Sequence, residues 1–283
     1  MSAVTLAPVR LRWDRRTRTL AQVGAALAVV LAVAVLGSLL VGVSADTDLP
    51  ARHQAPTWEH WFGTDRYGRD LLARTLVGLR LSLVVGTAAA VASGLIAAAL
   101  TLVAVAGGRV GRAVVAWLVD LFLALPHLVL LIMISFALGG GTTAVVIAIA
   151  VTHWPRLTRV LVAVATESVS GDHVAVSRAL GHGRWHVARR HLAPTLLPHL
   201  SVGIVLMFPH AILHEAALSF LGLGVDPDVP AVGVLLAESM RSLSAGHWWL
   251  AALPGLALLL VVKLVDTIGN GLRALADPRS HHL

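Results

Sequence analysis

The sequence predicts an all-α membrane protein with six transmembrane helices. Hydrophobic residues make up 57% of the 283 residues and charged residues only 13%, and the mean hydropathy is +0.81. A soluble domain carries roughly 25% charged residues, so half of the expected surface charge is missing and a soluble enzyme is a poor interpretation. The chain has no cysteine, which excludes disulfides, thiolate metal sites and cysteine nucleophiles.

Six apolar runs are long enough to cross a bilayer, for which a helix needs about 20 residues. They cover residues 20–43, 81–106, 113–138, 142–164, 197–223 and 247–268. The first run has no small-residue cleavage site at its end, so we expect a retained signal anchor rather than a cleaved peptide. We expect an external amphipathic segment over 44–80 and one core membrane domain over 81–269.

The placement of arginine predicts the orientation of these helices. The formal net charge is +7, with 22 Lys and Arg against 15 Asp and Glu. The basic residues concentrate in segment 1–19, in the turn that holds Arg109 and Arg112, and between the fourth and fifth runs. The positive-inside rule therefore predicts that segment 1–19 and the tail 270–283 are both cytoplasmic. Since topology accounts for the arginines, we expect lipid rather than nucleic acid as the partner.

Three stretches between or beside these runs have residue patterns that simple connecting loops do not have. Residues 60–74 combine turn glycines with a charged run, which fits an interfacial helix with Trp58, Trp61 and Tyr67 at the membrane surface. Residues 218–225 read Leu-Ser-Phe-Leu-Gly-Leu-Gly-Val, where glycines allow the fifth helix to end and the chain to turn.

The third stretch is the loop over residues 172–198. It predicts a short helix at 174–180, a break at Gly181 and Gly183, and a second helix at 185–192 that Pro194 ends. Such a helix-turn-helix, with Trp185 exposed on a basic surface, has a shape that can dock into a groove of another protein. An inert basic loop that only fixes topology is the alternative.

Together, the three stretches resemble the permease subunits of bacterial ABC importers for dipeptides, oligopeptides and nickel, in the second-permease branch. The resemblance covers roughly residues 20–279, and it lies in Phe62-Gly63-Thr64-Asp65, in Gly68-Arg69-Asp70, in the "LSFLGLG" signature at 218–224, and in Arg178-Ala179-Leu180-Gly181 with Ala193-Pro194. It implies the type I importer permease fold, a multi-pass protein of the bacterial cell membrane, and a cytoplasmic coupling loop over 166–198. Ala175, Val176 and Ser177 stand where the family usually has Glu-Ala-Ala.

The resemblance also implies the partners. They are a homologous permease, two ATP-binding subunits in whose clefts the coupling loops sit, and an external substrate-binding protein that docks near residues 65–70. The chain has no Walker-type glycine-rich lysine motif. We therefore expect a transport subunit that is not an enzyme and binds no cofactor, with ATP and Mg²⁺ held by the partner subunits.

Four of the 14 histidines lie within apolar runs: His127, His153, His210 and His214. Ionisable groups at membrane depth usually face a bundle interior or a water-filled path, so these histidines and Glu215 are the predicted translocation path. His210 and His214 are four residues apart and share one helix face. Because imidazole suits Ni, Cu and Zn, we expect His210, His214 and His153 as metal ligands.

Three cargo or activity hypotheses follow. The first is an importer of nickel or another metal, free or chelated, because the histidines resemble features of nickel-transporting members. The alternative is an importer of short peptides in which the histidines are structural. A remote alternative is an intramembrane metalloprotease, since His214-Glu215 begins an H-E-x-x-H motif, but the fifth position is Leu218.

Overall fold

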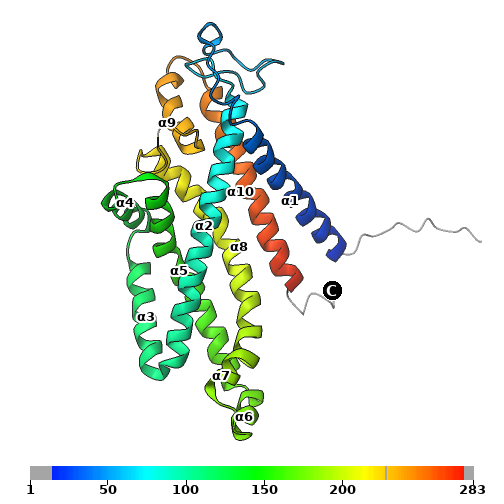
Figure 1. Ribbon diagram of the computed structural model, residues 1–283, viewed down its shortest axis with the longest axis vertical. Coiled ribbons are helices and arrows are strands. Elements are labelled where there is room, and N and C mark those ends of the chain that lie inside the picture. The colour runs from blue at the N-terminus through cyan, green and yellow to red at the C-terminus, as the bar shows by residue number, and fades with distance from the viewer. Residues whose placement is uncertain (1–14, 227, 277–283) are drawn as a thin grey trace, which may run out of the picture.

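The structure is a computed structural model that describes residues 15–226 and 228–276. Most of the predicted cytoplasmic N-terminus 1–19, Pro227, and the last seven residues of the tail 270–283 lie outside the described residues. The described helices are α1 (Arg15–Leu39), η1 (Leu49–Ala51), α2 (Leu71–Ala106), α3 (Gly108–Ala124), α4 (His127–Ala137), α5 (Gly141–Ser170), α6 (Asp172–Ala179), α7 (Arg184–Val187), η2 (Ala188–Leu192), α8 (Ala193–Phe220), α9 (Val232–Leu243) and α10 (Trp249–Ala276) (Figure 1).

Five of these helices are long and apolar enough to cross a membrane: α1, α2, α5, α8 and α10. The sixth predicted span is divided into α3 and α4, which are bent by 93° relative to each other. The prediction of one continuous helix over 113–138 is therefore wrong. The break lies at Pro126, which lacks a backbone N–H and disfavours helical geometry at the preceding Leu125, where ψ is 142°.

The second span begins at Leu71, ten residues before the predicted start at 81. Asp70 caps it, with the Asp70 carboxylate accepting a hydrogen bond from the Ala73 N–H at 2.8 Å. Residues before the cap form irregular turns rather than the expected interfacial helix, with Gly63 and Gly68 at positive φ. A side chain at position 68 would collide with the carbonyl of Asp48, so glycine is required there.

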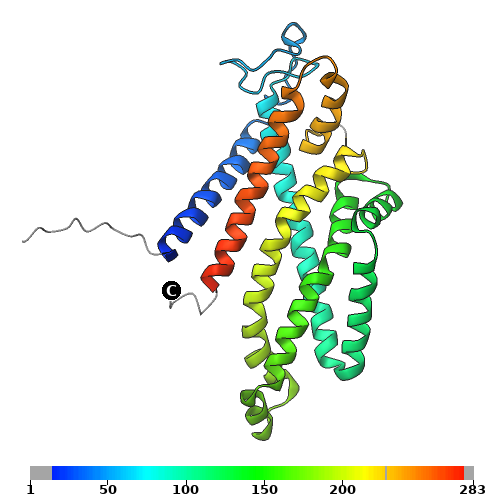
Figure 2. The same cartoon turned by 180° about the vertical axis from the view of Figure 1, so that it is seen from behind.

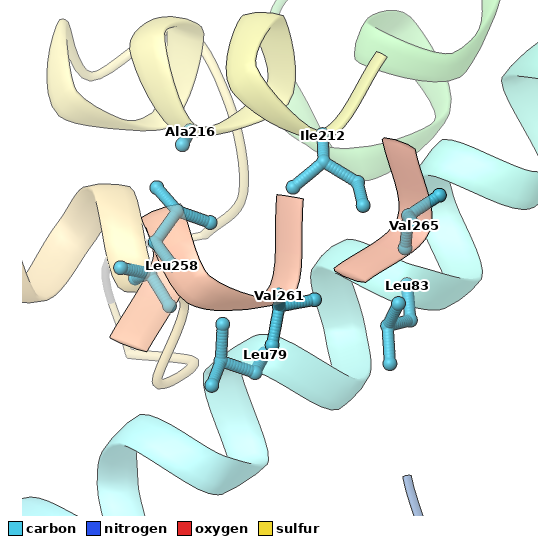
Figure 3. Packing of buried hydrophobic residues seen from close by; sticks show 8 residues of the cluster. Leu79, Leu83, Ile212, Ala216, Leu258, Val261 and Val265 are labelled. Atoms are coloured by element: carbon cyan, nitrogen blue, oxygen red, sulfur yellow. The ribbon is translucent and has the colours of Figure 1, made fainter. Parts of the chain in front are cut away.

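Helix α2 is central to the bundle, with α1, α3, α5, α8 and α10 in contact with it. Figures 1 and 2 show α2 running from the end that carries α9 down to the turn with α3, and crossing α5 on the way. One core cluster joins Leu79 and Leu83 of α2 to Ile212 of α8 and to Val261 and Val265 of α10 (Figure 3). These apolar contacts fix the relative positions of three of the spans.

The two ends of the bundle differ. One end carries the turns of residues 44–70 together with α9, a short helix that the sequence did not predict (Figures 1 and 2). The opposite end carries the short helices α6 and α7, which extend beyond the long helices, and the turn between α2 and α3. The predicted loop 166–198 is shorter than expected, because α5 continues to Ser170 and α8 begins at Ala193.

Candidate functional site

A cavity of about 920 Å³ lies between α3, α4, α5 and α8. Its size is at the upper end of the range of about 300–1,000 Å³ for small-molecule sites. Polar and charged side chains that line it are His127, Thr152, His153, Arg156, Thr195, His199, His210, His214 and Arg273. Leucine, valine, methionine, phenylalanine and proline side chains supply most of the rest of the wall.

Three of the predicted path histidines meet at the wall of this cavity. His127 comes from the first turn of α4, His153 from α5 and His214 from α8. Their ring centroids are 4.6 Å (His127 to His153), 4.9 Å (His127 to His214) and 5.1 Å (His153 to His214) apart. One ring nitrogen from each lies within 4.8 Å of the other two. We call these three residues the histidine triad.

The hydrogen bonds of His153 determine which of its nitrogens is free. The Nδ1 atom lies 3.0 Å from the carbonyl oxygen of Ile149, and because a carbonyl only accepts, Nδ1–H is the donor. In the neutral ring, Nε2 then carries the lone pair. That atom is buried and has no hydrogen-bond partner within the described chain.

His210 and Glu215 do not join the triad. His210 lines the same cavity but lies outside the group of three, which contains His127 together with two of the three expected ligands, His153 and His214. Glu215 is fully buried and faces away from the cavity. Its carboxylate accepts hydrogen bonds from Ser82 Oγ at 2.5 Å and Ser219 Oγ at 2.9 Å, which gives it a structural environment between α2 and α8.

The charges in the cavity have one sign. Arg156 of α5 and Arg273 of α10 line it, and no Asp or Glu appears among the described residues of its wall. The sequence interpretation counted Arg156 only as a topology signal. Arg156 follows His153 by three residues on the same helix, beyond Pro155. This spacing is the sequence feature that could have indicated its position at the cavity. Such a lining favours a ligand that carries a carboxylate or another anion.

The predicted coupling residues lie at the protruding end of the bundle. Arg178, Ala179, Leu180, Gly181 and Trp185 are all exposed. Leu180 and Trp185 are 72% and 78% exposed, which leaves two large apolar side chains open at the tip. Gly181 has a φ of +84°, and it ends α6 in the left-handed conformation that favours glycine.

Pro194 does not end a helix as predicted. It stands in the first turn of α8, where its missing N–H costs nothing, and the short π-helix η2 leads into it without a break in helical geometry. The segment after Gly183 therefore continues directly into a membrane span.

The Leu218–Val225 stretch ties the end of α8 to its neighbours. Leu223 accepts a hydrogen bond from Ser135 of α4 at 2.7 Å, and the Val225 N–H donates to Ser219 Oγ at 3.1 Å. Gly222 has a φ of +77°, which ends the helix at the predicted place. Through Ser219, this turn connects to the buried Glu215 carboxylate.

At the other end, a buried ion network holds residues 44–70 to the bundle. The Asp65 carboxylate accepts from Arg74 at 2.6 Å and from Arg69 at 2.7 Å, and Arg74 also donates to Glu238 of α9 at 3.0 Å. Asp65 is 5% exposed and Arg74 is 2% exposed. These ion pairs therefore hold residues 62–70 against α2 and α9, and the buried Asp65 carboxylate is not accessible to a partner protein.

Comparisons with known proteins identify the family of transport components to which these features belong. The model of the family described as "binding-protein-dependent transport system inner membrane component" matches residues 79–282. A Brucella suis protein provisionally named a peptide permease is 40% identical, with 83% of this chain and 78% of that protein covered. The dipeptide transport system permease protein DppC of Bacillus subtilis is 31% identical over 82% of this chain and 72% of that protein.

Among solved structures, an inward-facing structure of the MetNI methionine ABC transporter has a similar fold. The TM-score is 0.56 at 22% sequence identity, and the match covers 73% of this chain and 97% of that chain. This likeness confirms the predicted permease fold and carries no information about cargo. The match to the family over residues 79–282 confirms that the chain is a membrane component of a transport system.

Proposed function

The chain belongs to the family of binding-protein-dependent transport inner membrane components and is a multi-pass permease subunit of an ABC importer, and from this premise we propose that its cargo is short peptides. The peptide alternative fits the relatives better than nickel, which was the first prediction. The single observation in the structure that supports it is the cavity lining, which offers Arg156 and Arg273 without a carboxylate among the described wall residues. A peptide presents its C-terminal carboxylate to such a site and is attracted by the two arginines, whereas a metal cation gains no attraction from them.

In this proposal the chain works with a homologous permease, two ATPase subunits and an external binding protein. The exposed tip of α6 and α7 sits in a cleft of one ATPase, and closure of the ATPases shifts α8 and opens the cavity to the other side. The Leu180 and Trp185 side chains supply the apolar contact, since large exposed apolar groups mark protein interfaces. ATP and Mg²⁺ are bound by the ATPases.

The cargo proposal is tested by uptake of a labelled dipeptide and of ⁶³Ni²⁺ into cells that lack their own importers and express the complete system. We expect uptake of the peptide and none of the metal. Changing Arg156 to Gln should raise the KM for the peptide by at least about tenfold, because a charge-assisted contact contributes roughly 1.5–3 kcal/mol. Nickel uptake without peptide uptake would contradict the proposal.

A matched pair of glycine variants tests the coupling proposal. A side chain at either Gly181 or Gly183 meets no atom within 4 Å, but only Gly181 has a positive φ. Gly181→Val should therefore distort the tip and uncouple ATP hydrolysis from uptake, while Gly183→Val retains coupling. Equal uptake by both variants, with equal amounts of protein in the membrane, would contradict the assignment of this tip.

A further inference from the structure

We propose that the histidine triad, His127, His153 and His214, binds one divalent transition-metal ion at the cavity wall, with a fourth coordination position open to the cavity. This site is separate from the cargo: the ion is a bound occupant that links three helices and inhibits transport. The triad differs from the set expected from the sequence, because His127 replaces His210.

The geometry of the three rings carries the proposal. Each imidazole comes from a different helix, and one nitrogen of each lies within 4.8 Å of the others. Zn–N bonds are about 2.0–2.1 Å long, so tetrahedral ligand nitrogens stand roughly 3.3 Å apart. Small rotations of the rings about their side-chain bonds can bring the nitrogens, which now lie within 4.8 Å of one another, to this ligand separation, since the three rings are already in contact.

The hydrogen bonds of His153 provide a second observation. Its Nδ1–H donates to the Ile149 carbonyl, which fixes the ring and leaves the buried Nε2 lone pair without a partner among the described residues. A buried acceptor without a partner costs free energy, and a metal ion at the triad would satisfy it. Histidine ligands in metal sites commonly donate their other N–H to a carbonyl or carboxylate in this way.

The donor set selects the class of ion. Three neutral imidazoles suit Zn²⁺, Ni²⁺ or Cu²⁺, whereas Mg²⁺ and Ca²⁺ prefer oxygen ligands. No carboxylate joins the group, because the Glu215 oxygens are used by Ser82 and Ser219. The fourth position faces a cavity that also holds Arg156, so an anionic ligand such as hydroxide or a carboxylate is favoured there.

Occupation of the site would join α4, α5 and α8 through one ion. Residues of all three helices line the cavity, and α8 is the helix that continues from the α6–α7 tip. Alternating access requires these elements to move relative to one another. This step rests on the proposed transport function: if the helices must move for peptide uptake, then a metal link between them slows it.

Binding is tested first on the purified transporter complex in detergent, after treatment with a chelator and transfer to chelator-free buffer. Titration with Zn²⁺ in competition with a chromophoric chelator should show one site that is weakened at least about tenfold by His127→Ala or His214→Ala. His210→Ala is the matched control, because His210 lines the same cavity outside the triad. Zn²⁺ should also raise the melting temperature of the wild-type complex and of the control, and have a much smaller effect on the triad variants.

Two results would overturn the metal site: no difference in Zn²⁺ affinity between the wild type and the folded triad variants, or equal loss in His210→Ala. Because this assay does not use transport, it is independent of the cargo. Peptide uptake in proteoliposomes tests the consequence. We expect Zn²⁺ to reduce peptide uptake by a larger fraction in the wild type than in His127→Ala, each measured against its own uptake without metal; equal fractional inhibition of both would overturn the link between α4, α5 and α8. Absence of peptide uptake before any metal is added would instead contradict the proposed cargo.

Discussion

Glu215 lies in the middle of an apolar helix, and its burial is compensated by two hydroxyl groups. Both carboxylate oxygens are hydrogen-bonded, to Ser82 and Ser219. We expect Glu215→Ala to lower the free energy of unfolding by about 1–3 kcal/mol, because both hydroxyls lose their acceptor in a buried site. Glu215→Gln retains one carbonyl oxygen and should fall between the wild type and the alanine variant. Thermal unfolding of the purified complex measures the difference.

The same variants separate a structural role from a role in the translocation path. Since Glu215 does not line the cavity, peptide uptake per folded transporter should be unchanged in Glu215→Gln. Loss of uptake with a wild-type melting temperature would show that the carboxylate acts on the cargo.

The histidines show what spacing can and cannot predict. The four-residue interval correctly indicates one helix face for His210 and His214, and both line the cavity. Spacing within one helix cannot tell which residue of another helix approaches. His127 reaches the triad because the chain breaks at Pro126, and hydropathy, which registers only how apolar a run is, does not indicate the 93° bend there.

His53 should give the end of the molecule that holds residues 44–70 a dependence on pH. Burial and the stacked ring of His247, whose centroid is 4.4 Å away, lower the pKa of His53 below its ordinary value of 6.5. In the folded chain the neutral ring is favoured, so the stability of this contact is complete above pH 6.5. It decreases as the pH falls below 6.5, because the unfolded segment then binds a proton that the folded one resists.

Hydrogen exchange of residues 44–70 between pH 7.5 and pH 5 measures this effect. We expect faster exchange at acidic pH in the wild type and a weaker dependence in His53→Asn. Asparagine is chosen because position 53 has a φ of 54°, which asparagine tolerates. The same acid response in the variant would exclude His53 as its source.

At the level of elements, the break between α3 and α4 positions His127. Pro126→Ala restores a backbone N–H and removes the restriction on Leu125. We expect the bend to open and the distance between α3 and α4 labels to become longer and more broadly distributed. A straight helix would separate positions 121 and 133 by about 18 Å along its axis.

Spin labels at Leu121→Cys and Met133→Cys report this distance by pulsed electron resonance. Both side chains are exposed, at 42% and 61%, and the chain has no native cysteine that would add a label. An unchanged distribution in Pro126→Ala would mean that packing against α5, rather than the proline, sets the bend.

Hydropathy predicted the long helices well because the bilayer demands about 20 apolar residues for each. It placed the start of α2 too late, since Arg74 and Arg80 interrupt the apolar run although they lie within the helix. The Arg74 charge is compensated by Asp65, in the turns before α2, and by Glu238 of α9. Such compensation is invisible to a local average. A local average of hydropathy also did not predict the short helix α9.

For the whole molecule, charge and shape together predict an orientation. Arg109 and Arg112 lie in the first turns of α3. The turn between α2 and α3 is at the same end of the molecule as the α6–α7 tip (Figures 1 and 2). The positive-inside rule places this end in the cytoplasm and residues 44–70 outside. The orientation is also what the proposed mechanism needs, because a tip that contacts ATPases must face the compartment that holds ATP.

Cysteine substitution tests that orientation directly. Trp58 is 94% exposed at the outer end and Trp185 is 78% exposed at the tip, so each can be changed to Cys without opening the core. A membrane-impermeant maleimide should label Trp58→Cys in intact spheroplasts, and Trp185→Cys only after the membrane is permeabilised. Co-expression of the ATPase subunits should then reduce labelling at position 185, since the tip becomes covered. Labelling of Trp185→Cys in intact spheroplasts would place the tip outside, where no ATPase could reach it, and would contradict the orientation and the coupling proposal together.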